Sequence, residues 1–529
     1  MSKTFGMIGG GGGNIKLASI EITTPPEKTT YTAGETFDPA GMVVKATYSN
    51  GATAIATGYA YTPSTALTAG ITSVTIQYTE AGVTKTVEQA ITVSKAAGSL
   101  SISPDSLTLD NANPTGEIIV DRAGDGAISA VSSAPDIVSV SVSGNVVTVT
   151  GLASGSSVIT ISVAEGTNHN APADKTCNVT AAFVRIYGVT WDGSSTTALT
   201  RTDDAALFAD PVPAVGTGSG SSPFDSCLPW SGMTKVTDGN NVLVAIPKFW
   251  VRVTHSPFKV QIAEQATDGF QVSPAHRDRG DGVGERDVVY IGRYECNSSY
   301  YSKTGQAPQV STALATFRSG IKALGTGYYQ ADYALQLTLF YLYLVEFADW
   351  NSQSKIGRGN VDSDAVINTG GTDSMTYHTG RASGTDGNVA IQYRYIENLW
   401  GNVLEWRDGI IFSGVNICTY NNPENFADTY NATGATVRSN TRPTSSEWIK
   451  AWGYDTTDNS FIYPSAVGGS ETTYVPDYYH YYYRVRGLCV SGSYNRGADA
   501  GLFYLDGYPE PSLASSDLGS RLQKLPQAA

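Results

Sequence analysis

Apolar and polar residues alternate in short stretches over residues 15–182, a pattern that predicts β-strands. Residues 73–78 alternate in this way, as expected of a strand with one buried face. The pair Asn50-Gly51 separates two further stretches, 43–48 and 52–56. This pair predicts a tight hairpin in which both turn residues take positive φ.

A second β-rich segment is expected at residues 100–182, after a linker of small residues at 95–99. Its runs 145–150 and 157–163 are rich in β-branched residues, and a glycine-bounded stretch, 151–155, separates them. β-Branched side chains suit the half-buried surface of a pleated sheet. We therefore expect a second β-sandwich here.

Two stretches beyond residue 184 have the period of a helix. Residues 312–324 predict an amphipathic helix, because their apolar positions recur every three or four residues. These positions are Leu314, Phe317, Ile321 and Leu324. Residues 332–349 are apolar nearly all round, which predicts a buried helix, and Asp332 is placed to cap its N-terminus.

The amino-acid composition also changes near residue 184. All eight tryptophans lie at or beyond Trp191. A chain of 529 residues is too long for one hydrophobic core, and three or four domains are expected. The formal charge of −14 argues against binding to a nucleic-acid backbone, which needs clustered Lys and Arg.

The sequence does not indicate a metal site or a disulfide framework. The cysteines are odd in number and scattered, without a CxxC pair, and are expected to be reduced and buried. They are Cys177, Cys227, Cys296, Cys418 and Cys489. Residues 278–287 are rich in Asp and Gly, but their spacing departs from an EF-hand. A solvated loop is expected there, with a calcium site as the alternative, and we predict neither metal nor cofactor.

The first 13 residues end in five glycines and predict either a flexible linker or an attachment segment that orders on docking. They lack the apolar core of a secretory signal. No run in the chain approaches the length of a membrane span. For a protein that acts at a cell surface, the lack of a signal and of a membrane span would fit a virion component, made in the host cytoplasm and released by lysis, without membrane insertion.

Three short motifs in the first β-rich segment resemble bacterial Ig-like domains. They are Ile22-Thr23-Thr24-Pro25, YTAGETFD at 31–38 and Gly41-Met42-Val43-Val44. The segment at 100–182 is similar to a second bacterial Ig-like family. This resemblance implies rigid β-sandwich spacers, with weak glycan binding as the alternative.

Two motifs near the C-terminus resemble the C-type-lectin-like fold of the formylglycine-generating-enzyme family. They are residues 398–406 (NLWGNVLEW) and residues 484–522, which close on SSDLGSRL at 515–522. More narrowly, they resemble the variable ligand-binding proteins of diversity-generating retroelements, many of which are phage receptor-binding proteins. The resemblance implies helices beside a twisted sheet with long loops, and a ligand-binding surface.

Catalysis of the family's own kind is not expected. Its enzymes carry a Cys-x4-Cys pair just after a Gly-Ser-Tyr segment, and here the matching positions are Arg496 and Gly501. Neither residue provides a thiolate. The segment that contains Glu405 packs near the core in the resembling fold, so we interpret Glu405 as structural and not catalytic.

The remaining candidates for a functional site are aromatic residues. Residues 474–508 contain nine tyrosines interleaved with small polar residues. Tyr offers a large contact area and a hydroxyl at low entropic cost. Tyr482 and Tyr483 precede the strand at 484–486, one face of which must be buried, so alternate tyrosines there are expected in the core or at subunit contacts. The predicted ligand-binding residues are Tyr478, Tyr479, His480, Tyr481, Tyr494, Asn495, Arg496, Asp499, Tyr504, Asp506, Tyr508, Ser512, Ser515 and Ser516. Exposed positions are expected for Tyr494, Asn495, Arg496, Asp499, Tyr504, Asp506 and Tyr508, with subunit packing or a plain surface role as the alternative.

The sequence thus predicts a mainly β chain with two Ig-like β-sandwiches, 14–95 and 98–182, followed by an α+β C-type-lectin-like domain at 184–529. The predicted function is that of a phage tail-tip adhesin that recognises a host-surface protein or glycan. Other tail or baseplate proteins are expected partners, and a homotrimer is the favoured assembly. The alternatives are a structural virion or cell-surface protein and a glycan-acting enzyme.

Overall fold

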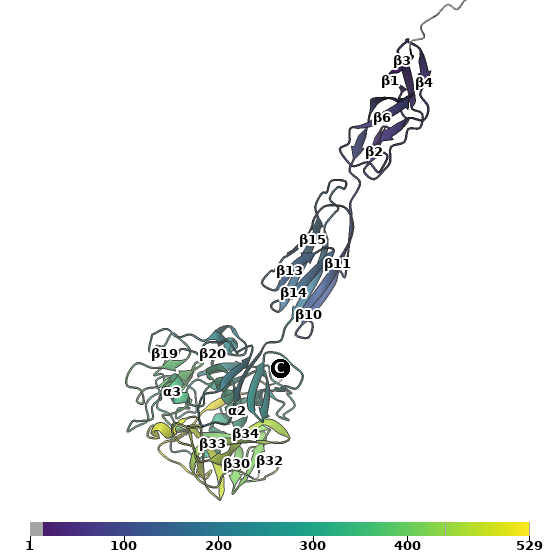
Figure 1. Ribbon diagram of the computed structural model, residues 1–529. Helices are drawn as coiled ribbons and strands as arrows, with labels where there is room; N and C mark the ends of the chain where they lie inside the picture. The colour runs from purple at the N-terminus through teal and green to yellow at the C-terminus, as the bar shows by residue number, and fades with distance from the viewer. Residues whose placement is uncertain (1–13, 440, 528–529) are drawn as a thin grey trace, which may run out of the picture. The chain divides into compact units, whose positions relative to one another are not determined.

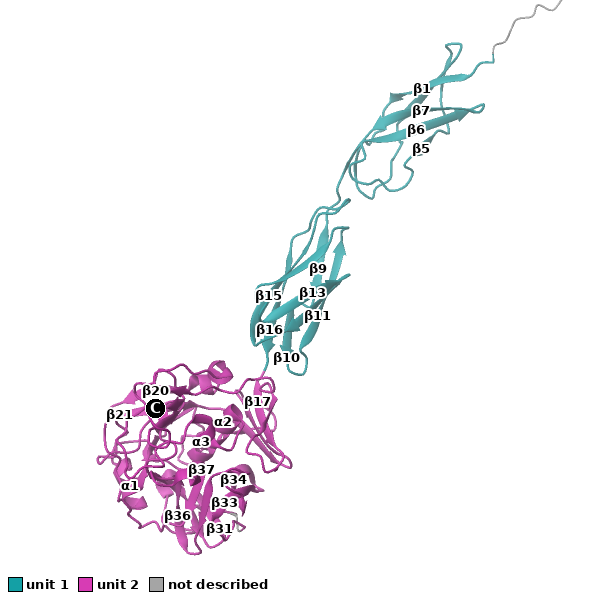
Figure 2. Cartoon of the chain, turned by 60° about the vertical axis from the view of Figure 1, so that its left-hand side comes forward, with its two compact units in different colours: residues 1–183 teal, residues 184–529 magenta. Residues whose placement is uncertain are grey.

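The computed structural model describes residues 14–439 and 441–527, so the predicted attachment segment at 1–13 lies outside the described residues. The chain divides into two compact units, residues 1–183 and residues 184–529 (Figure 2). Strands dominate both units, which confirms the mainly β class.

Unit 1 contains two β-rich parts, each with a hydrophobic core of its own. The strands of the first part are β1 (Leu17–Thr24), β2 (Thr30–Thr32), β3 (Val43–Tyr48), β4 (Thr53–Ile55), β5 (Ala60–Thr62), β6 (Ser73–Glu80), β7 (Val83–Ala90) and β8 (Thr92–Ser94). They form the sheets β1-β3-β4, β5-β6-β7 and β2-β8. Val44 and Val74 lie fully buried between the two three-stranded sheets.

The second part is a sandwich of two four-stranded sheets, β10-β16-β15-β12 and β13-β14-β11-β9. Its strands are β9 (Ser99–Ser103), β10 (Ser106–Asp110), β11 (Thr115–Ala123), β12 (Ile128–Ser132), β13 (Val138–Ser143), β14 (Val146–Gly151), β15 (Gly155–Val163) and β16 (Lys175–Ala182). Both β-branched runs expected from the sequence are strands. Their alternate residues Val147 and Ile159 are fully buried in this core.

The hairpin predicted at Asn50-Gly51 joins the antiparallel strands β3 and β4. The prediction that both turn residues take positive φ is wrong, because Gly51 has a φ of 81° and Asn50 is not in that region. The Gly51 N–H donates to the Tyr48 carbonyl at 2.8 Å, and the Tyr48 N–H donates to the Ala52 carbonyl at 2.9 Å. This is a longer turn closed by a bulge, which requires one left-handed residue.

The described residues of unit 2 form four sheets and three α-helices. One five-stranded sheet contains β17 (Ile186–Trp191), β18 (Thr200–Asp203), β22 (Trp250–His255), β23 (Phe258–Ala263) and β24 (Gln271–Val272). The other contains β20 (Thr234–Asp238), β21 (Asn241–Pro247), β25 (Val288–Gly292), β26 (Tyr328–Gln330) and β39 (Leu522–Lys524). A small sheet contains β19 (Ala214–Val215), β27 (Gly380–Arg381), β28 (Ile391–Tyr393) and β29 (Ile396–Glu397).

The largest sheet of unit 2 has nine strands in the order β32-β31-β30-β36-β37-β35-β33-β34, with β38 paired to β30. Its strands are β30 (Leu404–Ser413), β31 (Asn416–Tyr420), β32 (Ala435–Ser439), β33 (Glu447–Asp455), β34 (Asp458–Val467), β35 (Tyr478–Tyr481), β36 (Val485–Ser491), β37 (Gly501–Gly507) and β38 (Leu518–Ser520). The helices are α1 (Leu314–Lys322), α2 (Tyr333–Phe347) and α3 (Ser352–Ile356).

Helix α2 lies inside unit 2, with strands around it (Figure 1). The Asp332 carboxylate accepts a hydrogen bond from the Leu335 N–H at 2.9 Å, which confirms the predicted cap. Every residue of α2 except Ala334 is buried, as its all-round apolar sequence predicts. The predicted amphipathic helix is also confirmed as α1, whereas the short α3 was not predicted.

Arg521 connects the two C-terminal motifs through a buried charge network. Its guanidinium donates to Glu405 at 2.7 Å and to the backbone carbonyls of Gly292 and Glu397 at 2.9 and 2.7 Å. Arg407 donates to the other Glu405 oxygen at 2.7 Å. Glu405 is fully buried and both its oxygens are engaged, in agreement with its predicted structural role.

All five cysteines are free and buried, as predicted. The expectation of a solvated loop at 278–287 is wrong for its two arginines. Arg279 pairs with Asp332, and Arg286 pairs with Asp281 and donates to the Pro526 carbonyl at 3.0 Å. Both arginines are buried, because these partners satisfy their charges inside the fold.

Candidate functional site

The predicted ligand residues lie on and around β35, β36 and β37, adjacent strands of the nine-stranded sheet, of which β36 and β37 are labelled in Figure 2. β35 pairs with β37 in parallel, so that Tyr479 faces Leu505 and His480 faces Asp506 in the register. β36 pairs with β37 in antiparallel fashion on its other side. Because alternate residues of a strand point to opposite faces, these residues divide into two sets.

One set faces the core of unit 2. Tyr479 is buried there together with Phe503 and Leu505, and its hydroxyl accepts a hydrogen bond from Arg442 at 2.8 Å. The prediction of a ligand-binding role at the surface is wrong for Tyr479. The strand period explains this, since a residue between Tyr478 and His480 must point to the opposite face.

The other set forms a compact polar group, the His480 cluster, whose members are Tyr478, His480, Arg496, Asp499, Tyr504 and Asp506. The His480 ring lies 4.7 Å from the Tyr478 ring and 5.8 Å from the Tyr504 ring, measured between centroids. The Tyr504 hydroxyl donates to Asp506 at 3.3 Å. All six members are predicted ligand residues, brought together from a strand pair and one loop.

Burial within the His480 cluster departs from the prediction. Tyr504 and Asp506 are buried, so the expectation that they are exposed is wrong, whereas the other four members are partly exposed. The central position of β37 between β35 and β36 accounts for this difference. Tyr504 and Asp506 therefore form the floor of the cluster, beneath its partly exposed members.

The electrostatics of the cluster follow from this burial. Burial lowers the pKa of His480, and Arg496 lowers it further, while Asp506 opposes the shift. Burial raises the pKa of Asp506 and of Asp499, and the nearby His480 opposes both shifts. Among the described residues, His480 Nε2 and Arg496 Nε have no hydrogen-bond partner. The cluster thus keeps polar atoms that a bound group could satisfy.

The loop that carries Arg496 and Asp499 is held by backbone hydrogen bonds. The Tyr494 N–H donates to the Asn402 carbonyl at 3.0 Å, and the Ser363 N–H donates to the Tyr494 carbonyl at 2.9 Å. The Gly497 N–H donates to the Val361 carbonyl at 2.9 Å, and Gly497 takes a φ of 56°. These contacts fix the position of the loop without using its side chains.

A second group of rings, the tyrosine patch, consists of Tyr482, Tyr483 and Tyr508. The ring of Tyr482 lies 4.9 Å from each of the other two rings. Tyr483 is 58% exposed and Tyr508 is 53% exposed. The Arg486 guanidinium lies 4.2 Å from the centre of the Tyr482 ring, and Arg484 lies 5.4 Å from the centre of the Tyr483 ring.

The sequence prediction placed alternate tyrosines at Tyr482 and Tyr483 in the core or at subunit contacts, and a core position is wrong for Tyr483. β35 ends at Tyr481 and β36 begins at Val485, so neither tyrosine belongs to a strand with a buried face. The tyrosine content of the segment is visible in the sequence. The strand ends that expose it depend on pairing with β33 and β37, which the local pattern does not reveal.

The other predicted residues are distributed around these groups. Tyr481 is half-buried beside Arg442, whose guanidinium lies 4.7 Å from the centre of its ring. Asn495 is exposed, as expected, and Tyr494 is half-buried. Ser512 and Ser516 are exposed as well. The Ser515 hydroxyl donates to Asp517, which leaves Ser515 half-buried.

A groove of about 440 Å³ is lined in part by residues close in sequence to the tyrosine patch. Val485, Glu510 and Ser512 line one part of it, and Ala313 and Ala315 at the start of α1 line another. The groove is thus apolar where alkyl groups line it and polar at Asp428, Glu510 and Ser512. Such mixed surfaces suit non-covalent recognition of a ligand.

Within the part of the chain that the structure describes, no group of three or more His, Cys, Asp or Glu residues is arranged to hold a metal ion. None of the described helices has the length and apolar character needed to cross a membrane.

Comparison with known families identifies part of unit 1. Residues 24–93 match the model of the bacterial Ig-like domain (group 3). This segment is Ig-like. The Ig-like segment contains β2 to β7 in full, and the match confirms the Ig-like fold that the sequence motifs predicted there. No curated protein matches the chain.

Several solved structures are similar to the chain at low identity. The Major Tropism Determinant U1 variant is 12% identical, with a TM-score of 0.23, over 75% of this chain and 85% of that one. Domains 4 and 5 of the S-layer protein SbsC are 16% identical, with a TM-score of 0.17, over 32% of this chain and 99% of that one.

The longer S-layer structure rSbsC(31-844) is 15% identical, with a TM-score of 0.18, over 39% of this chain. The chain spans 36% of the length of that structure. TM-scores this low do not establish a common overall arrangement.

Proposed function

We propose that this chain is a phage tail-tip adhesin that binds a host-surface protein or glycan through unit 2. The observation that carries the proposal is the tyrosine patch, in which two rings are more than half exposed and contact a third. Exposed aromatic rings beside arginines are typical of the residues that dominate binding energy at interfaces. Exposed apolar side chains that gather in one patch also mark interaction surfaces.

The ligand contacts the tyrosine patch and the adjoining groove, and the His480 cluster forms a recessed polar part of the same binding surface. Rings at the patch supply contact area with few torsions to immobilise. Arg496 and His480 supply hydrogen-bond donors or acceptors that are not already engaged. The buried residues of β37 support this surface without contacting the ligand.

In this proposal the two β-rich parts of unit 1, residues 14–95 and 98–182, act as spacers, and residues 184–529 form a C-type-lectin-like ligand-binding domain. The protein is located in the tail or baseplate of a virion and assembles as a homotrimer. Repetition of a modest binding site in a trimer raises avidity without new contacts. Retroelement-driven diversification would act on the exposed residues and not on the buried Tyr479, Tyr504 and Asp506.

Binding and not catalysis is the proposed activity. Glu405 is the carboxylate most readily interpreted as catalytic. It is fully buried and forms ion pairs with Arg407 and Arg521. A general acid must reach its substrate within hydrogen-bond distance. Glu405 has no such access in this fold.

The proposal is tested by replacing Tyr483 and Tyr508 with alanine in one variant and measuring adsorption of the protein, or of particles that carry it, to host cells. We expect adsorption affinity to fall by about tenfold or more, since anchor rings contribute on the order of 1–2 kcal/mol each. The melting temperature should stay close to that of the wild type, because both rings are largely exposed.

The matched control is Tyr454→Ala, which removes a 38% exposed tyrosine that stacks on His255 elsewhere in unit 2. Adsorption of this control should be unchanged. Normal adsorption by the Tyr483/Tyr508 variant would contradict the proposal. Failure of particles to assemble would instead support the structural role, in which the tyrosine patch packs against neighbouring subunits.

A further inference from the structure

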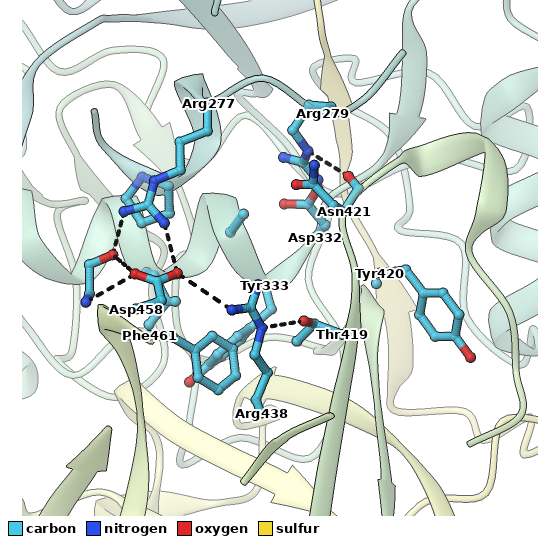
Figure 3. A pocket seen from close by; sticks show the side chains of 15 residues that line it. Arg277, Arg279, Asp332, Tyr333, Thr419, Tyr420, Asn421, Arg438, Asp458 and Phe461 are labelled. Carbon is cyan, nitrogen blue, oxygen red and sulfur yellow. Dashed lines mark hydrogen bonds and ion pairs between the residues drawn. The ribbon is translucent and has the colours of Figure 1, made fainter. Parts of the chain in front are cut away.

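A pocket of about 60 Å³ lies at the start of α2 (Figure 3). Its lining comes from the first turns of α2, from residues 274–279, and from β31 and β34. None of the predicted ligand residues lines it. The pocket is therefore separate from the adhesion surface proposed above, and its occupant needs an explanation of its own.

Three arginines converge on this pocket, two of which are already engaged. Figure 3 shows Arg277 and Arg279 on one side and Arg438 on the other. Arg277 donates to Asp458 at 2.7 Å and to the Ser460 hydroxyl at 2.5 Å. Arg438 has partners as well, the Thr419 hydroxyl at 2.8 Å and Asp455 at 3.2 Å.

Arg279 differs from the other two because it is only 2% exposed and incompletely paired. Its Nε donates to the Asn421 carbonyl at 2.7 Å, and its Nη2 pairs with Asp332. Its Nη1 has no hydrogen-bond partner among the described residues. An unpaired N–H on a buried guanidinium is energetically costly, so an acceptor that reaches Nη1 would stabilise the fold.

The size and polarity of the pocket restrict that acceptor. A polar cavity needs about 10–15 Å³ for each water molecule, so this one accommodates a few waters or one small polar group. A ligand must displace such waters and still satisfy the Nη1 group. A compact oxygen acceptor meets both requirements, whereas an apolar group would leave Nη1 unpaired.

The charges around the pocket balance one another, and the unpaired Nη1 of Arg279 is the group that favours an anionic oxygen. Three guanidinium groups and two carboxylates, those of Asp332 and Asp458, line it, and Asp455 contacts Arg438 from outside the lining. Asp332 is committed twice, to the Leu335 N–H and to Arg279. The N-terminal end of the α2 dipole adds partial positive charge. The carboxylates are thus already neutralised by their partners.

We propose that this pocket binds one small oxyanion group, a carboxylate or a phosphate, on Nη1 of Arg279. Guanidinium groups form strong, charge-assisted hydrogen bonds to both kinds of oxyanion. Arg277 and Arg438 are partly exposed and form the entrance, and Arg279 lies at the closed end. The group enters past the first two and pairs with the third.

The test is thermal unfolding of the full-length protein at neutral pH with increasing sodium acetate, sodium phosphate or sodium chloride at matched ionic strength. We expect acetate or phosphate to raise the melting temperature in a saturable way beyond the effect of chloride, as a ligand specific for the native state does. A response to acetate alone identifies a carboxylate, and a response to phosphate alone identifies a phosphate. Equal curves in all three salts would overturn the proposal.

Two variants connect the response to this pocket. Ala334→Leu fills the cavity from the first turn of α2 without a change in charge, and it should weaken the apparent affinity about tenfold or more. Arg279→Lys keeps the charge but removes the guanidinium fork, and it should weaken the response similarly.

The matched control is Ala323→Leu, the same change at the exposed C-cap position of α1. It should respond like the wild type. If Ala334→Leu does not fold, Arg279→Lys remains as the independent variant. An undiminished response in whichever of the two folds would overturn the assignment to this pocket.

Discussion

His276 is held neutral by its surroundings in unit 2. It is fully buried, and its Nε2 lies 2.9 Å from the Ile246 carbonyl oxygen, which can only accept a hydrogen bond. The proton of the neutral ring therefore resides on Nε2, and Nδ1 accepts from the Ser273 hydroxyl at 2.6 Å. Burial lowers the pKa of His276 to about 4, and the nearby Lys248 adds to the shift.

This arrangement predicts that unit 2 loses stability as the pH falls from about 6.5 towards 4. In that range the unfolded chain protonates His276 and the folded chain does not, so acid favours unfolding. The loss attributable to His276 is on the order of 3 kcal/mol at pH 4. Denaturant midpoints measured from pH 7.5 to pH 4 should therefore fall.

The matched variant for this measurement is His276→Gln, which keeps a donor and an acceptor but does not titrate. We expect it to be less stable than the wild type at pH 7 and to show a flatter dependence on pH. Parallel curves for the two proteins would assign the acid sensitivity to other groups.

Local periodicity predicted the elements that local interactions determine. The all-round apolar sequence predicted α2 as a buried helix, and Asp332 as its cap. The Asn50-Gly51 pair located the first hairpin but not its turn type, because the bulge at Gly51 depends on how β3 and β4 are paired. Pattern in the sequence is thus sufficient where the contacts are near neighbours.

The candidate site was predicted less completely, because it depends on contacts between distant segments. The tyrosine-rich composition identified the correct region, and six predicted residues meet in the His480 cluster. The burial of Tyr504 and Asp506 follows from the central position of β37, which no local pattern encodes. Likewise, the buried Arg279 has partners more than fifty residues away, so its loop looked solvated in the sequence.

At the scale of elements, Arg521 joins β25, the segment after β29, and β30 through one buried guanidinium. Replacing Arg521 with methionine should lower the free energy of unfolding of unit 2 by about 3–5 kcal/mol, because Glu405 keeps only Arg407 and several carbonyls lose their donor. Denaturant titration followed by tryptophan fluorescence measures this, since all eight tryptophans lie in unit 2.

The comparison variant is Lys322→Met, which breaks an ion pair with Glu424 in which both side chains are about half exposed. Exposed pairs contribute about 0–1 kcal/mol, so this variant should unfold almost like the wild type. Similar losses in both variants would show that the Arg521 network does not join these elements in the way its hydrogen bonds indicate.

At the scale of the whole molecule, each β-rich part of unit 1 has its own core. Val44, Val74 and Ile76 belong to the first core, and Val147 and Ile159 belong to the second. Unit 2 has its own large core around α2. Separate cores are the physical basis for domains that fold independently, as the proposed boundaries at 14–95, 98–182 and 184–529 require.

Differential scanning calorimetry of the full chain, of residues 14–183 and of residues 184–529 tests this organisation. If the units fold independently, the thermogram of the full chain should equal the sum of the two fragments, because no unit then depends on another for its core. Arg521→Met should lower the transition of residues 184–529 in both contexts and leave the transitions of residues 14–183 unchanged. A fragment that fails to fold alone, or a shift in all transitions on this one substitution, would contradict the independence of the units. A spacer that folds independently carries a binding domain without altering it, which is the property the adhesin proposal requires of unit 1.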